Sequence, residues 1–245
     1  MSKAQPQTTP PNHSREPLDK STDFYKNRTN DVRDHRLAQW ASVYHQLRLP
    51  ATLTDVNSVL EFGPGRGLFG NILKFYGMDY YSADVVQVKG ADKPDFLHSI
   101  NDFPIGNQTF DLVCAFQTLE HNPPSEFLPH LEKMAALSNK YVYVSLPWHG
   151  RSFSWNIGIN LPKLAKNFMG SVVWPRLVNK KRPHDQYAKD PNPYRFHWFE
   201  VGEPGFSKKE IKETAAKAGL KQVQSFHVEG FAYHYFILFE KIDIT

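Results

Sequence analysis

The stretch SVLEFGPGRGLFGNIL, residues 58–73, constrains the fold more than any other part of this sequence. A short apolar run ends at a glycine-rich loop, and apolar residues then recur at helical spacing up to Gly77. A strand, loop and helix in this order begin an α/β sheet, and such sheets bind ligands at the carboxyl ends of their strands. The loop is therefore the first candidate for a ligand-binding site.

The rest of the chain continues to alternate between strand and helix patterns. Helices are expected over 31–49, 67–77, 123–138 and 207–220. Strands are expected over 57–62, 78–85, 94–100, 109–116 and 140–147, followed by a β-hairpin over 220–241. The order predicts an α/β fold: a Rossmann-like, mostly parallel sheet of seven strands with an antiparallel last strand and helices on both faces.

The composition gives no sign of a membrane-spanning, secreted or disulfide-bonded protein. The chain has 245 residues and no apolar run of the roughly 18 residues that a membrane span needs. Its N-terminus lacks the apolar segment of a secretory signal, and its one cysteine, Cys114, allows no disulfide within the chain, so a cytoplasmic location is expected. Residues 1–22 are polar and proline-rich, which predicts a disordered tail. Cys114 lies in an apolar run and is expected to be a buried core residue.

An unusually long connection, residues 147–206, separates the fifth strand from the last helix. It carries nine Lys and Arg, four Asp and Glu, and four of the five tryptophans. We expect it to form an inserted lid, with one or two short helices from 155–178 lying over the site. Its charge suits an anionic partner, either a small molecule or RNA, and the stretch 160–182 also suits the surface of an anionic membrane. The alternative is a folded decoration with solvated lysines.

Two ligands compete for the glycine loop. A dinucleotide fingerprint, G-x-G-x-x-G, matches only from Gly65 to Gly70, which is late relative to the strand. The pattern that fits without displacement is E-x-G-x-G-x-G, from Glu61 to Gly67. A carboxylate at Glu61 would repel a pyrophosphate, but it would attract the ammonium group of S-adenosylmethionine. Asp84, at the end of the next strand, suits the ribose hydroxyls of either ligand.

Three stretches in this order, VLEFGPGRG, YYSADV and NDFPIGNQTFDLVCAFQTLEH, resemble the motifs of class I S-adenosylmethionine-dependent methyltransferases, most closely the quinone-biosynthesis branch. The resemblance covers residues 55–146. It implies a methyltransferase domain, which we place over 23–245 with an N-terminal helical segment, 23–50. The basic, tryptophan-rich insertion 147–206 adds the expectation of a small acceptor that is anionic or aromatic. An RNA-directed methyltransferase and a cofactor-binding protein without turnover remain alternatives.

The resemblance also implies a set of cofactor contacts. They are Glu61, Gly63, Pro64, Gly65, Gly67, Asp84, Val85, Ser99, Ile100, Phe116 and Gln117. Ser99 departs from the family pattern, which often has an aspartate for the adenine amino group, and the neighbouring Asp102 is an alternative for that contact.

Catalysis of methyl transfer depends mainly on holding the nucleophile, methyl group and sulfur in line. A general base helps when the nucleophile must lose a proton, and His121 and His149 are the candidates because they follow the fourth and fifth strands. A structural role for His121 as a loop brace is the alternative, and His184 and His197 rank behind both. No His or Cys cluster has zinc spacing, so no metal site is predicted.

Overall fold

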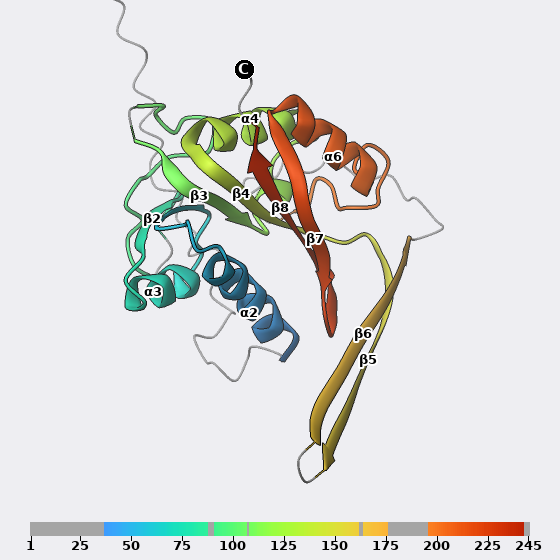
Figure 1. Cartoon of the computed structure of the whole chain (residues 1–245). Helices are drawn as coiled ribbons and strands as arrows, with labels where there is room; N and C mark the ends of the chain where they lie inside the picture. The colour runs from blue at the N-terminus through green and yellow to red at the C-terminus, as the bar shows by residue number, and fades with distance from the viewer. Residues whose placement is uncertain (1–36, 88–90, 107, 162–163, 176–195, 243–245) are drawn as a thin grey trace, which may run out of the picture.

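The computed structural model describes residues 37–87, 91–106, 108–161, 164–175 and 196–242 (Figure 1). The predicted tail 1–22 and the basic stretch 176–195 lie outside these residues, so the expectations for them are not addressed.

The core of the molecule is a six-stranded sheet with the strand order β2-β1-β3-β4-β8-β7. Its strands are β1 (Ser58–Phe62), β2 (Asp79–Ala83), β3 (Phe110–Phe116), β4 (Ser138–Pro147), β7 (Leu220–Val228) and β8 (Phe231–Lys241). The first four pair in parallel, whereas β8 runs antiparallel to both β4 and β7. The predicted mostly parallel sheet with an antiparallel last strand is therefore confirmed.

One predicted strand of the seven does not form among the described residues. The segment 94–100 contributes only a single parallel bridge, from Phe96 to Ala83 at the end of β2. The carboxylate of Asp95 accepts hydrogen bonds from the backbone N–H (2.8 Å) and hydroxyl (3.0 Å) of Ser82. A side chain thus takes a donor that a neighbouring strand would otherwise use, and the pairing does not extend.

Helices cover both faces of the sheet, as predicted (Figure 1). They are α2 (Leu37–Thr52), α3 (Leu68–Phe75), α4 (Phe127–Leu137) and α6 (Lys208–Lys217). Alternate residues of β3 face the two layers: Val113 packs in the cluster that contains α4 and α6, and Leu112 packs in the cluster with α3. Cys114 is fully buried, in agreement with its predicted place in the core.

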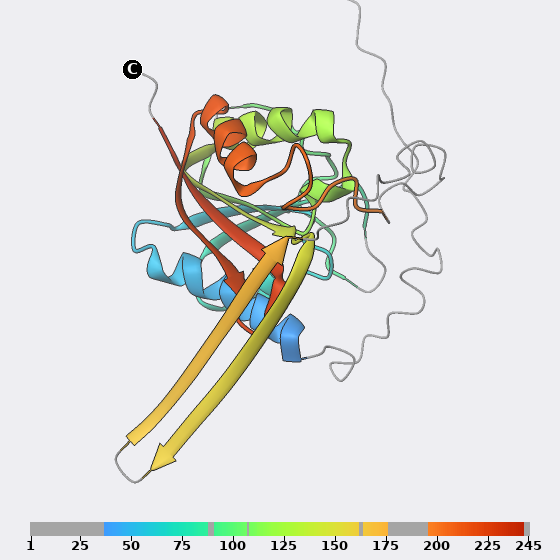
Figure 2. The same cartoon turned by 90° about the vertical axis from the view of Figure 1, so that its right-hand side faces the viewer.

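The first part of the insertion, directly after His149, is a long antiparallel hairpin, β5 (Gly150–Leu161) and β6 (Leu164–Pro175). Figures 1 and 2 show it projecting away from the sheet. The expectation of one or two short helices over 155–178 is therefore wrong. Polar and apolar residues alternate with period two from Ser152 to Asn160, which favours a strand over a helix. Within the described ranges, no helix has both the length and the apolar character needed to cross a membrane.

Candidate active site

The glycine loop connects β1 to α3 with left-handed backbone angles at alternate positions. Gly63, Gly65 and Gly67 have φ values of +70°, +58° and +76°, a region that residues with a side chain rarely adopt. A Cβ at Gly63 would lie 2.6 Å from Oγ1 of Thr118, which follows β3. A Cβ at Gly65 would meet nothing within 4 Å. The loop therefore packs against the end of β3 on one side and leaves its tip open to a ligand.

The closest packing against α3 occurs at Gly70 rather than at Gly67. Gly67 caps α3, and a Cβ there would meet only the side chain of Asn71, at 3.8 Å. A Cβ at Gly70 would lie 2.2 Å from the ring of Tyr80, so no larger residue fits unless the ring moves. Gly70 lets the phenol of Tyr80 pass beneath α3.

Glu61 is the acid of the loop motif, and its side chain lies under the loop rather than in solvent. It is 4% exposed and accepts a short hydrogen bond from the hydroxyl of Tyr80. Burial raises the pKa of Glu61 to about 7, despite the opposing effect of this hydrogen bond. The sequence points to Glu61, but Tyr80, which holds its carboxyl in place, was not anticipated because its partner lies on another strand.

The acid predicted for the ribose lies beside the loop. Asp84 directly follows Ala83, whose carbonyl accepts a hydrogen bond from the N–H of Gly63 at 2.9 Å. The carboxylate of Asp84 accepts from the N–H of Val86 at 3.3 Å, and Val85, between them, is half-buried. Ser99 donates to Asp102 at 2.8 Å, which ties the two candidates for the adenine contact together.

Of the remaining predicted cofactor contacts, some are buried in the core and others lie in loops at the carboxyl edge of the sheet. Ile100 and Phe116 are buried, with 5% and 7% exposure, and their side chains pack in the two core clusters. Gln117 has a φ of +50°, unusual for a residue with a side chain, and its amide donates to the hydroxyl of Ser145 at 3.3 Å. The carbonyl of Pro64 accepts a hydrogen bond from the N–H of Gly67 at 2.9 Å, which closes the turn of the loop.

A segment distant in sequence, residues 196–203, crosses the carboxyl edge of the sheet. The N–H of Trp198 donates to the carbonyl of Glu120 at 2.7 Å, next to the end of β3. The N–H of Val201 donates to the carbonyl of Pro147 at 2.8 Å, at the end of β4. These backbone hydrogen bonds bring side chains from three parts of the chain to one edge of the sheet.

His149 lies in a carboxylate cluster at this edge. Its Nδ1 is 3.2 Å from a carboxylate oxygen of Glu200 and 3.4 Å from one of Glu203. The other oxygen of Glu200 lies 3.1 Å from Nδ1 of His197 and accepts from the hydroxyl of Tyr233 at 3.4 Å. Glu200 thus joins two histidines, and Nε2 of His149 is buried without a hydrogen-bond partner among the described residues.

His121 lies on the neighbouring short helix η2 (Leu119–His121). Its Nδ1 is 2.9 Å from the carbonyl of Phe196, and its ring contacts the ring of His197 edge-on, with 5.0 Å between centroids. The adjacent Glu120 is completely buried, and burial, with a smaller effect from the charge of Glu200, raises its pKa to about 8. The structure therefore brings both predicted catalytic histidines to one edge, together with His197, Glu120 and Glu200, which sequence reasoning ranked low or missed. Glu120 stands among polar residues, in the stretch QTLEHN, so no local pattern in the sequence predicts its burial.

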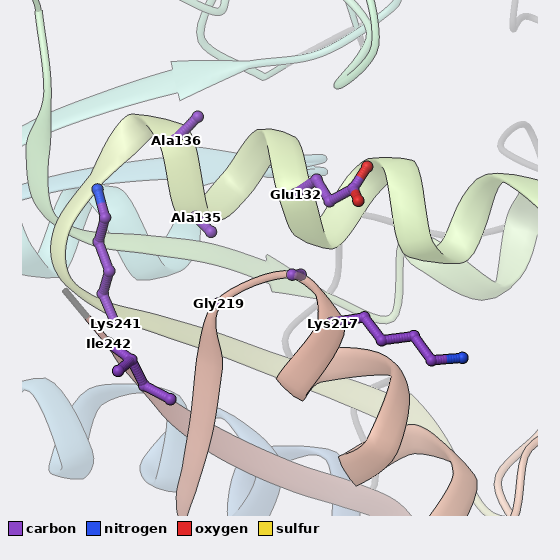
Figure 3. Close-up of a pocket in the computed structure, with 8 residues that line it drawn as sticks. Glu132, Ala135, Ala136, Lys217, Gly219, Lys241 and Ile242 are labelled. Atoms are coloured by element: carbon purple, nitrogen blue, oxygen red, sulfur yellow. The ribbon is translucent and has the colours of Figure 1, made fainter. Parts of the chain in front are cut away.

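A hollow elsewhere on the molecule lies at the other edge of the sheet. It is lined by residues near the ends of α4 and α6, among them Glu132, Lys217 and Lys241 (Figure 3). Lys241 donates to the carbonyl of Ser138 at 2.8 Å, at the start of β4. None of the predicted site residues lines this hollow, so the candidate site remains at the carboxyl ends of the strands.

Comparisons with known proteins agree with this geometry. A family model described as a methyltransferase domain matches residues 32–225. A comparison with curated protein sequences finds no match.

Among solved structures, the N-methyltransferase NodS from Bradyrhizobium japonicum superposes with a TM-score of 0.56 at 13% identity, covering 90% of this chain and 96% of its own. The 1,6-didemethyltoxoflavin-N1-methyltransferase from Burkholderia thailandensis gives a TM-score of 0.53 at 16% identity, covering 87% and 82%. At these identities the likeness concerns the fold. The family model covers most of the chain, so the protein belongs to the methyltransferase domain family and has the fold of class I S-adenosylmethionine-dependent methyltransferases.

Proposed function

We propose that this protein transfers a methyl group from S-adenosylmethionine to a small anionic or aromatic acceptor, with His149 as the general base. The observation that carries the proposal is the arrangement at the carboxyl edge of the sheet. An open glycine loop contacts Thr118 at the end of β3, and His149 follows the neighbouring strand β4, with its outer ring nitrogen buried and unpartnered among the described residues. The loop proposed for the cofactor and the proposed base thus lie near the ends of adjacent strands.

The loop and its neighbours suit S-adenosylmethionine better than a dinucleotide. Glu61 places an ionisable carboxyl under the loop, where a pyrophosphate would meet repulsion and a cationic methionine end would be stabilised. We expect Asp84, which follows β2, to accept hydrogen bonds from the ribose. A Cβ at Gly65 would meet nothing within 4 Å, which supports a close approach of the backbone to the ligand. The similar structures from Bradyrhizobium japonicum and Burkholderia thailandensis were solved with S-adenosylhomocysteine, which supports the same choice.

The hydrogen-bond geometry of His149 supports its proposed role as the base. When Nδ1–H donates to Glu200 at 3.2 Å, Nε2 carries the lone pair and can accept a proton. The acceptor would transfer its proton to Nε2 while its nucleophilic atom bonds to the methyl carbon. The carbon–sulfur bond breaks at the same time, and its electron pair remains on sulfur. The positive imidazolium that results is stabilised by Glu200 and Glu203.

The charge of the insertion bears on the chemical class of the acceptor. The insertion between β4 and α6 has a net charge of +5 by sequence, which favours an anionic acceptor. The Burkholderia thailandensis relative holds 1,6-didemethyltoxoflavin, a small molecule. No contact among the described residues favours RNA.

Calorimetry tests the cofactor. We expect S-adenosylmethionine and S-adenosylhomocysteine to bind the wild-type protein with micromolar affinity, and we expect NAD not to bind. Asp84→Ala should weaken both by about tenfold to a hundredfold, because it removes a charge-assisted hydrogen bond of roughly 1.5–3 kcal/mol. Binding of NAD alone, or of none of the three, would contradict the proposal.

Turnover tests the base. With an acceptor found by screening phenols, carboxylates and amines for release of S-adenosylhomocysteine, His149→Ala should lower kcat by about 10²–10⁴-fold. Affinity for S-adenosylhomocysteine should not change. His98→Ala is the matched control, because His98 is exposed and lies on the 94–100 segment beyond β2. Equal kcat values for His149→Ala and the wild type would remove His149 from the mechanism.

A further inference from the structure

The carboxylate of Glu120 is buried in the fold without a partner among the described residues. The side chain is 0% exposed, and neither of its oxygens has a hydrogen-bond partner among the described residues. Its main chain is held, since the carbonyl accepts the N–H of Trp198 at 2.7 Å. A buried carboxyl without partners is strongly destabilising unless a cation or a proton neutralises it.

Two histidine side chains lie close to this carboxylate, and the three groups together form a possible set of ligands for a cation. Glu120, His121 and His197 each offer one ligand atom, and these atoms all lie within 4.8 Å of one another. Ligands at about 2.0–2.2 Å from a tetrahedral ion are roughly 3.4 Å apart. Small rotations of the three side chains would therefore close the set around one ion. The residues come from η2 and from the segment 196–203, so the site exists only where these two parts of the chain meet.

The hydrogen bonds behind the histidines fit metal ligation. Nδ1 of His121 is 2.9 Å from the carbonyl of Phe196, which can only accept, so this nitrogen carries the proton. Nδ1 of His197 is 3.1 Å from the carboxylate of Glu200, which indicates the same tautomer. In both rings Nε2 is then the basic nitrogen. A carbonyl or carboxylate behind Nδ1 is the usual way in which proteins orient a metal-binding histidine.

We propose that Glu120, His121 and His197 bind a divalent transition-metal ion, for which Zn²⁺ is the probe. Two imidazoles and one carboxylate suit zinc or ferrous iron better than magnesium or calcium, which prefer oxygen ligands. Three protein ligands leave one position open for a further ligand, as in catalytic rather than structural zinc sites.

The location of the site in the fold suggests which ligand would occupy the open coordination position of the ion. Thr118, which contacts Gly63 of the glycine loop, is linked to the site because its carbonyl accepts the N–H of His121 at 3.2 Å. Glu200 joins His197 to His149 on the other side. An oxygen of the acceptor bound to the ion would thus lie between the cofactor loop and the base. Only this role of the ion rests on the proposed function; metal binding itself does not.

Metal titration tests the site directly. Full-length protein without a histidine tag would be treated with EDTA, desalted and titrated with Zn²⁺ in a calorimeter, and with Co²⁺ while the visible d–d absorption is recorded. We expect one high-affinity ion per chain. Glu120→Gln and His197→Ala should each weaken binding by about a hundredfold or more, and Glu200→Gln by roughly 10–100-fold, because Glu200 orients His197. His98→Ala should bind like the wild type.

Two further measurements distinguish a loss of metal ligands from a failure to fold and from a failure of the cofactor site. Thermal unfolding of the metal-free variants shows whether each folds, and His197→Ala, at a partly exposed position, keeps the test valid if Glu120→Gln does not fold. S-adenosylhomocysteine titrations of the same metal-free samples test the cofactor site independently. Failure of S-adenosylhomocysteine alone would contradict the proposed function and leave the metal site standing. Absence of one-to-one Zn²⁺ binding, or equal weakening by His98→Ala, would overturn the metal site.

Discussion

Ionising the side chain of Glu61 in the folded protein is energetically unfavourable. Its carboxyl is buried, and its pKa is raised from 4.5 to about 7. A buried acid with a raised pKa is bound to its proton more tightly in the folded state. Its contribution to stability is therefore fully present below pH 4.5 and is lost as the pH rises through 7. The loop depends on a carboxyl that is costly to ionise until a cationic ligand arrives.

This leads to a prediction for Glu61→Gln, which keeps an acceptor for the hydroxyl of Tyr80 but cannot ionise. The difference between pKa values of 4.5 and about 7 corresponds to about 3 kcal/mol. Between pH 5 and pH 8, the free energy of unfolding of the wild type should fall relative to that of the variant by about 1–3 kcal/mol. Urea denaturation at four pH values measures this difference. Parallel curves for the two proteins would show that Glu61 ionises freely.

A second prediction concerns Gly70. Gly70→Ala places a Cβ against the ring of Tyr80, at 2.2 Å if nothing moves, and should lower the free energy of unfolding by about 1–3 kcal/mol. Gly106→Ala is the control, because Gly106 lies outside the left-handed region and a Cβ there meets nothing within 4 Å. Replacing Tyr80 by leucine should reduce the cost of Gly70→Ala in a double-mutant cycle. Equal stabilities of the two alanine variants would contradict the assigned role of Gly70.

At the scale of elements, β5 and β6 differ from every other pair in the fold. They form a two-stranded hairpin on their own, and one face exposes apolar side chains, with Phe153, Ile157 and Val172 more than half exposed. A hairpin of two strands is marginally stable in water. The six-stranded sheet does not need the hairpin for its pairing, because β4, which precedes the hairpin, already pairs with β3 and β8. The hairpin is thus an appendage of the methyltransferase fold.

Shortening the hairpin tests this interpretation. Ser152 pairs with Val173, so an Asn-Gly turn can join them in place of residues 153–172. The free energy of unfolding should change by less than about 1 kcal/mol, and the affinity for S-adenosylhomocysteine should be retained. Denaturant unfolding and calorimetry measure both. A loss of cooperative unfolding would instead show that the hairpin belongs to the folding unit.

At the scale of the whole molecule, the layers follow from patterns that are local in sequence. The apolar run of β3 predicts a strand buried on both faces, and Ser207 with Glu210 predicts the start of α6, where both hydrogen bonds of a capping box are present. The strand predicted over 94–100 failed because Asp95 bonds to Ser82, a contact that no local pattern reports. The helices predicted over 155–178 failed because polar and apolar residues alternate with period two from Ser152 to Asn160, which favours paired strands.

Outside the insertion and the segment 94–100, the sequence alone therefore determined the order of strands and helices. It also determined the glycine loop and the acids Glu61 and Asp84. Each depends on backbone angles or periodicity that neighbouring residues set. Tertiary structure decided which side chains share the carboxyl edge. The contact between His121 and Phe196 spans 75 residues, and no short-range pattern encodes such a distance. It forms because the segment 196–203 adds backbone hydrogen bonds to the ends of β3 and β4, which places Glu120, His149 and His197 together.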